Sequence, residues 1–147
     1  MKMMKNPAAV LMASIAITLL FGCGKAAPLP RKAMQQVREL MTQQGRLEWF
    51  SATARAAIQL NDNPDRDKSL QQIESQMPAL HGHTAFSCYT RKEATTGEDI
   101  LYGSWHTGLT ATGVIVGGTN FTPATVAWPR YRFERLTNGV YIFYISS

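Results

Sequence analysis

The chain of 147 residues changes its pattern of apolar residues near Leu80, and this change constrains its fold more than any other feature. Before Leu80, apolar side chains recur every three or four residues, which is typical of amphipathic helices. After Leu80, β-branched and aromatic residues become frequent and glycines separate them, which indicates strands joined by turns. The sequence therefore predicts an α+β fold, with an N-terminal helical hairpin packed on a C-terminal, mainly antiparallel sheet.

The helical half contains two predicted segments. The first runs from Arg31 to about Leu60, and Gly45 in its middle costs about 1 kcal/mol relative to alanine, so that a kink or break is expected to fall there. The second follows Asn63, a good N-cap residue, and ends before Pro78.

The second half contains five predicted strands. The final two flank Asn138-Gly139, a pair that indicates a two-residue hairpin with a type I′ turn. We expect strands near 84–91, 99–106, 111–117, 124–134 and 139–146.

The N-terminus has the organisation of a secretory signal peptide. Lys2 and Lys5 precede an apolar stretch from Ala8 to Phe21. This stretch of about 14 residues is too short to cross a bilayer comfortably, which takes about 20 residues.

The apolar stretch ends in Leu20-Phe21-Gly22-Cys23, a run that resembles the lipobox of bacterial lipoproteins. The resemblance implies cleavage before Cys23 and attachment of lipid to this cysteine. Because Gly24 rather than aspartate follows, it also implies sorting to the outer membrane, facing the periplasm.

On this interpretation the chain divides into a signal peptide at 1–22, a lipidated tether at 23–30 and a single α+β domain at 31–147. Two alternatives remain open. Cys23 could belong to an uncleaved anchor, or a general signal peptidase could cut after Ala26.

Removal of residues 1–22 takes away Lys2 and Lys5, which lowers the net charge from +5 to +3 and leaves 125 residues for one domain. The remaining basic residues are spread along the chain without a block of like charges. We therefore expect no nucleic-acid partner.

Histidines and a cysteine gather in one part of the sequence and could offer metal ligands. His81 and His83 would share a face if their segment were extended, and His106 or Cys88 could complete a site. The chain lacks the paired ligand spacing of zinc motifs, so we predict no metal and no cofactor. As the odd cysteine of an exported chain, Cys88 could be a free thiol or form an intermolecular bridge, and its strand-like surroundings favour a buried free thiol.

Catalytic motifs are not recognisable. Ser104 and His106 would share a face of one strand, and Asp99 lies nearby, but no Gly-x-Ser-x-Gly elbow surrounds the serine. We therefore expect the protein not to be an enzyme.

Aromatic and arginine side chains are the best candidates for partner binding, because both are enriched at interface hot spots. We expect Trp49 and Tyr131 to be exposed and, together with Arg130 and Arg132, to contact a partner.

These features predict a non-enzymatic accessory subunit that binds an envelope protein complex of secretion, pilus or conjugation type. An alternative is an inhibitor or immunity lipoprotein that blocks a periplasm-acting enzyme with a loop at 91–98 or 117–123. A metal-binding protein is a third alternative.

Overall fold

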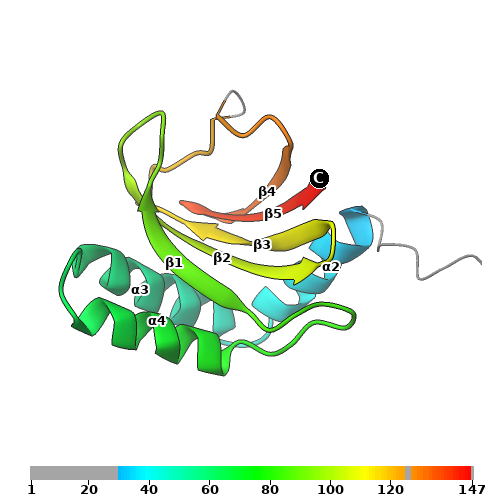
Figure 1. The fold of residues 1–147 in the computed structure, drawn as a ribbon, viewed down its shortest axis with the longest axis horizontal. Helices are drawn as coiled ribbons and strands as arrows, with labels where there is room; N and C mark the ends of the chain where they lie inside the picture. The colour runs from blue at the N-terminus through cyan, green and yellow to red at the C-terminus, as the bar shows by residue number, and fades with distance from the viewer. Residues whose placement is uncertain (1–29, 125–126, 147) are drawn as a thin grey trace, which may run out of the picture.

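The computed structural model of the protein describes residues 30–124 and 127–146. The signal peptide, Cys23 and most of the tether lie outside these residues. Within the described residues, three helices precede five strands, which confirms the predicted α+β fold (Figure 1). The helices are α2 (Pro30–Met41), α3 (Arg46–Gln59) and α4 (Asp65–Gln76).

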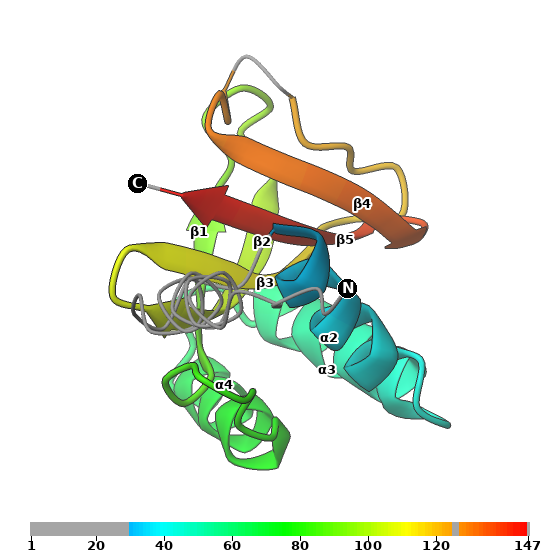
Figure 2. The same cartoon turned by 90° about the vertical axis from the view of Figure 1, so that its right-hand side faces the viewer.

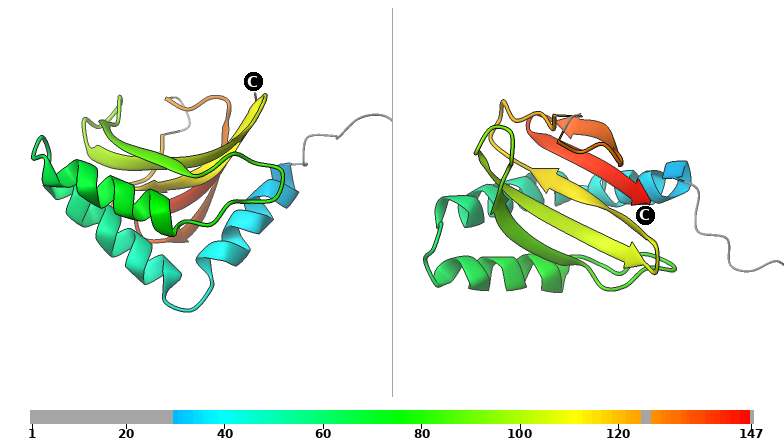
Figure 3. Two further views of the ribbon diagram at one scale, coloured as in Figure 1. Left: turned by 60° about the horizontal axis from the view of Figure 1, so that its bottom comes forward. Right: turned by 45° about the horizontal axis from the view of Figure 1, so that its top comes forward.

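The break expected at Gly45 separates α2 from α3. Gly45 has a φ of 75°, a left-handed conformation that glycine adopts at little cost. The two helices meet there at an angle, and α3 and α4 then run side by side as the predicted hairpin (Figure 3). At the start of α4, Asn63 accepts a hydrogen bond from the Asp65 N–H at 2.9 Å, as a capping side chain does.

The strands form one antiparallel sheet in the order β1-β2-β3-β5-β4. Three predicted boundaries are wrong. Residues 84–86 precede the first strand. The fourth strand starts at Tyr131 because Trp128-Pro129-Arg130 turns instead of extending, and it ends at Thr137 instead of 134. The strands are β1 (Ser87–Lys92), β2 (Asp99–Thr107), β3 (Thr110–Val116), β4 (Tyr131–Thr137) and β5 (Val140–Ser146).

The hairpin at Asn138-Gly139 joins β4 to β5, as predicted, but its turn is not type I′. A type I′ turn needs a positive φ at both central residues. Gly139 has a φ of 71°, whereas Asn138 does not have a positive φ. The register shifts between Arg135 and Thr137, so the strand is irregular directly before the turn.

The helices cover one face of the sheet (Figure 2). Phe50 of α3 and Ile73 of α4 are fully buried there with Trp105 of β2, and Val37 of α2 joins them. Arg38 of α2 also forms a bidentate ion pair with Glu134 of β4. The helical layer is thereby fixed to both the centre and one edge of the sheet.

The opposite face of the sheet carries a second apolar cluster, covered by the segment between β3 and β4. Phe121 and Trp128 of that segment pack with Phe143 of β5 and Tyr102 of β2. Tyr102 also reaches Tyr131 of β4, although β3 and β5 lie between their strands. The sheet is therefore strongly curled (Figure 1). This cluster lies inside the curl.

None of the helices in residues 30–124 and 127–146 is long and apolar enough to span a membrane.

Candidate protein-binding surface

Aromatic rings and one arginine form a continuous surface on the sheet face that lies away from the helices. We call this set the aromatic–arginine surface. Its members come from β1, β2, β4 and the turn before β4: Tyr89, Arg91, Tyr102, Trp128 and Tyr131.

The surface is built from the edge strand inward. Tyr89 is the register partner of Tyr102, and their ring centres are 5.3 Å apart. Arg91 lies two residues after Tyr89 on β1. Its guanidinium carbon is 4.3 Å from the ring centre of Trp128 and 5.5 Å from that of Tyr102. Such cation–π contacts hold an exposed arginine in place on an apolar base.

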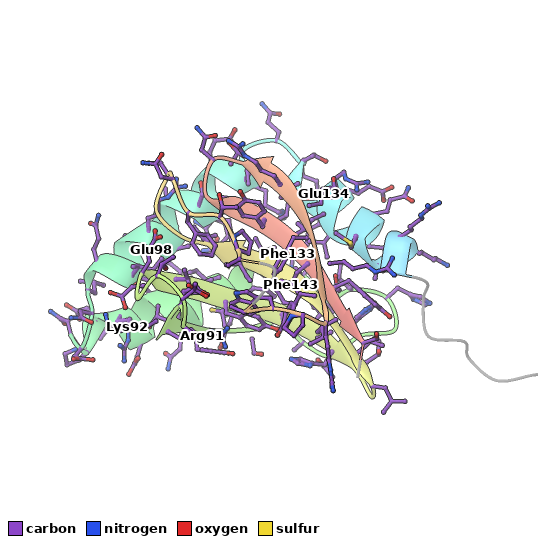
Figure 4. The ribbon with its side chains drawn as sticks, turned by 90° about the horizontal axis from the view of Figure 1, so that it is seen from above. Arg91, Lys92, Glu98, Phe133, Glu134 and Phe143 are labelled. Carbon is purple, nitrogen blue, oxygen red and sulfur yellow. The ribbon has the colours of Figure 1, made fainter. Side chains whose placement is uncertain are left out.

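Exposure differs strongly within this surface. Tyr89 is 46% exposed and Arg91 is also exposed, whereas Trp128 and Tyr102 are buried beneath them. An exposed ring and guanidinium on a fixed aromatic base have the composition of a protein-binding hot spot. The two central labelled rings, Phe133 and Phe143, extend this base, and Arg91 lies at the β1 side (Figure 4).

The surface continues into an open hollow of about 560 Å³ at the end of the curled sheet where the turn between β2 and β3 lies. Ala111 and Ile145, which are register partners on β3 and β5, contribute apolar groups to it. Tyr102 and Tyr131 line it as well, and Arg130 and His106 add polar groups.

The two tyrosine hydroxyls in the hollow lie 3.2 Å apart and share a hydrogen bond. Burial and this bond to Tyr131 raise the pKa of the Tyr102 hydroxyl well above its usual range. Tyr102 therefore stays protonated and can act as a hydrogen-bond donor.

His106 is fixed by a neighbour on its own strand. Its Nε2 atom lies 2.9 Å from the Ser104 hydroxyl oxygen, which confirms that the two side chains share a face. Ser104 is only 2% exposed, so its hydroxyl orients the imidazole but is shielded from molecules outside the sheet.

The turn between β1 and β2 is organised around the buried carboxylate of Glu93, which is 1% exposed. This carboxylate accepts hydrogen bonds from the backbone N–H and the hydroxyl of both Thr95 and Thr96. Trp128 Nε1 donates another at 3.3 Å, which links the turn to the aromatic–arginine surface.

The pKa of Glu93 reflects two opposing effects. Burial acts to raise it, but the hydrogen bonds from Thr96 and Thr95 favour the charged form and outweigh burial. The pKa therefore lies below its ordinary value, and Glu93 remains ionised at neutral pH.

The predicted partner-binding residues are divided between the two sides of the sheet. Tyr131 and Arg130 line the hollow. Arg132 is exposed, but it alternates with Tyr131 along β4 and lies on the helix-facing side, as Glu134 does. Trp49 packs against the helix-side core.

The expected exposure of two aromatic residues is wrong. Trp49 and Tyr131 are both half-buried, whereas Tyr89 is the exposed aromatic residue in the described part of the chain. Trp49 packs edge-on against Phe50 because it lies beside the buried stripe of α3 instead of opposite it.

The candidate metal ligands do not converge. Cys88 faces α4, whereas His106 lies on the other face of the sheet. The His83 ring bonds the backbone carbonyl of His81, and both residues belong to the loop before β1. Among the described residues, no group of three His, Cys, Asp or Glu side chains could hold a metal ion.

Cys88 is a buried free thiol, which agrees with the expectation from its strand-like surroundings. Burial and, secondarily, the charge of Glu74 raise its pKa to about 12. Its Sγ atom points at the Leu70 carbonyl 3.7 Å away.

Sequence reasoning missed Tyr89, Arg91, Tyr102 and Trp128 as members of this surface, and it missed Glu93 as a support for it. The alternation of Tyr89 and Arg91 in a predicted strand was a usable signal, because it places both on one face. For Glu93, the following Thr95-Thr96 pair was a weaker signal of a turn closed by side-chain hydrogen bonds. Comparisons with protein families, curated proteins and solved structures found no match to this chain.

Proposed function

We propose that this protein is an outer-membrane lipoprotein that faces the periplasm and acts as a non-enzymatic, protein-binding subunit of an envelope assembly. Lipid on Cys23 would hold it at the membrane, and the tether of residues 24–30 would span at most about 25 Å. The folded domain would therefore meet its partner close to the membrane surface.

The aromatic–arginine surface is the observation that carries this proposal. Tyr89 and Arg91 are exposed at the sheet edge, and the buried rings of Tyr102 and Trp128 hold them from below. Aromatic and arginine side chains dominate binding energy at protein interfaces, and an aromatic ring buries a large area at a low cost in conformational freedom.

A binding role also agrees with the surroundings of the Ser104–His106 pair. The serine hydroxyl is covered on the sheet, and Asp99 lies at the other end of β2, where its side chain pairs with Lys92. A nucleophilic serine needs a base that is itself oriented and a path to the substrate. The pair is better explained as support for one wall of the hollow.

The turn between β1 and β2 favours a second candidate, an inhibitor of a periplasm-acting enzyme. Residues 94–97 are exposed, and Glu93 fixes the turn from beneath through the bonds to Thr95 and Thr96. A preorganised turn loses less conformational entropy when it enters an active site.

The test is affinity purification of the full chain from detergent-solubilised membranes of the native host. Wild type is compared with the surface variant Tyr89→Ser/Arg91→Ser and with Cys23→Ser. A matched control, Lys68→Ser/Gln72→Ser, changes two exposed residues of α4 on the other side of the sheet.

We expect an envelope complex to co-purify with wild type and the α4 control, to be weaker with Cys23→Ser and to be lost with the surface variant. Retention of the complex by the surface variant would contradict the proposed binding surface. A soluble enzyme captured equally by wild type and Cys23→Ser would instead support the inhibitor function.

A further inference from the structure

The hollow beside the aromatic–arginine surface combines a positive rim with an apolar base. Arg130 is exposed at its rim, and it makes no ion pair with any residue in 30–124 and 127–146. Ala111 and Ile145 supply apolar groups, and among the described residues no acidic side chain lines the hollow. This arrangement is complementary to a group that is both apolar and negatively charged.

The tyrosine pair adds a hydrogen-bond donor to this site. Two hydroxyls that share one hydrogen bond use only one of their two protons in it. The Tyr102–Tyr131 pair, with 3.2 Å between its oxygens, therefore retains one O–H for an acceptor in the hollow. An anionic oxygen is the acceptor that gains most from such a donor next to an arginine.

We propose that the hollow binds the C-terminal carboxylate of a partner chain that ends in an apolar residue. Arg130 pairs with the carboxylate, the free tyrosine O–H donates to it, and the terminal side chain lies on Ala111 and Ile145. A C-terminal residue carries its charge beside its side chain, which matches the closeness of the positive rim to the apolar base. This inference rests on the proposed protein-binding function and names the part of the partner that is recognised.

The test measures binding of labelled peptides to the full-length chain in detergent by fluorescence anisotropy. The probe is fluorescein-Gly-Ser-Gly-Ser-Leu with a free carboxyl terminus. Its controls are the same peptide with an amidated terminus and a free-acid peptide with serine in place of leucine. Dodecanoate serves as a competitor, because a fatty acid carries the same chemistry.

We expect the free-acid leucine peptide to bind at least about tenfold more tightly than the amide, as a charge-assisted hydrogen-bonded pair implies. Arg130→Gln should abolish this difference. Arg132→Gln removes the same charge two residues away on the helix-facing side and should leave the difference unchanged. The serine peptide should bind more weakly than the leucine peptide.

Equal binding of acid and amide, or an acid preference that survives Arg130→Gln, would overturn the proposal. Arg130-dependent binding of dodecanoate without peptide binding would also overturn it, in favour of a lipid ligand. If the peptides fail while the envelope complex still depends on Tyr89 and Arg91, only this inference falls. If the peptides bind while no complex depends on those residues, only the proposed function falls.

Discussion

Glu93 illustrates at the scale of one residue how a buried charge fixes a turn. Its carboxylate receives bonds from Thr95, Thr96 and Trp128, and a hydrogen bond to a charged group contributes about 1.5–3 kcal/mol. We predict that Glu93→Gln lowers the free energy of unfolding by roughly 1–3 kcal/mol in urea titrations, because the amide offers only one acceptor oxygen. Glu98→Gln is the control, since the Glu98 carboxylate accepts a hydrogen bond from the backbone N–H of Gly118, after β3, and does not fix the Thr95–Thr96 turn. An equal loss in both variants would contradict the special role of Glu93.

The lowered pKa of Glu93 makes this contribution depend on pH. A carboxyl whose pKa is lower in the folded than in the unfolded chain stabilises the fold above its unfolded pKa, about 4.3. The contribution is lost as the pH falls through the folded pKa. The stability difference between wild type and Glu93→Gln should therefore be constant from pH 7 to 5 and shrink below about pH 4. A difference that grows in acid would show that the pKa shift has the opposite sign.

Cys88 should be chemically inert in the folded protein. Its thiol is buried and has a pKa of about 12, so almost none of it is the reactive thiolate at pH 8. We predict that iodoacetamide labels Cys88 at least about a hundredfold faster in 6 M guanidinium chloride than in buffer, as peptide mass spectrometry would measure. Rapid labelling of the native protein would indicate that α4 separates from β1.

At the scale of elements, two glycines with similar backbone angles differ in their surroundings. Gly139 (φ 71°) closes the β4–β5 hairpin, and a Cβ atom there would lie 2.0 Å from the Gly118 carbonyl oxygen. Gly45 (φ 75°) separates α2 from α3, and a Cβ atom there would have no neighbour within 4 Å. We predict that Gly45→Ala costs about 1 kcal/mol for the left-handed backbone alone. Gly139→Ala should cost clearly more in the same denaturation assay, and equal losses would contradict the close packing of the hairpin on Gly118.

Elements that depend on local sequence could be predicted, and those that depend on distant contacts could not. The spacing of apolar residues predicted the helices, and Gly45 predicted the break between α2 and α3. The pair Asn138-Gly139 predicted the last hairpin. The predicted turn type was wrong because the register shifts directly before the turn, between Arg135 and Thr137, and such a bulge depends on the partner strand. The early start assigned to the fourth strand failed because Trp128 turns to pack inside the curl.

At the scale of the whole molecule, the curl of the sheet creates the candidate site. It brings Tyr131 of β4 against Tyr102 of β2 across two intervening strands. The sequence alone identified Tyr131 and Arg130 as candidates. It could not predict that they lie on the same surface as Arg91, because no local pattern encodes the curvature of a sheet. It also could not separate them from Trp49, whose position depends on how α3 packs.

Anchoring is the property of the whole molecule that the lipobox resemblance predicts. We expect wild type in the outer-membrane fraction of the host and Cys23→Ser in the soluble periplasmic fraction, because two or more acyl chains hold a protein stably at a bilayer. Immunoblotting of fractionated cells checks this. The control Cys88→Ser should remain in the membrane, and equal fractionation of Cys23→Ser and wild type would contradict lipid attachment at Cys23.

The most direct test of the central claim is site-specific photocross-linking in living host cells. A benzoylphenylalanine residue replaces Tyr89 on the aromatic–arginine surface, and the control variant carries it at Gln72 on α4. Both positions are exposed, so both can react with a bound partner. The proposed function predicts one discrete envelope-protein adduct from position 89 and none from position 72. No adduct at position 89, or the same adducts at both positions, would contradict it.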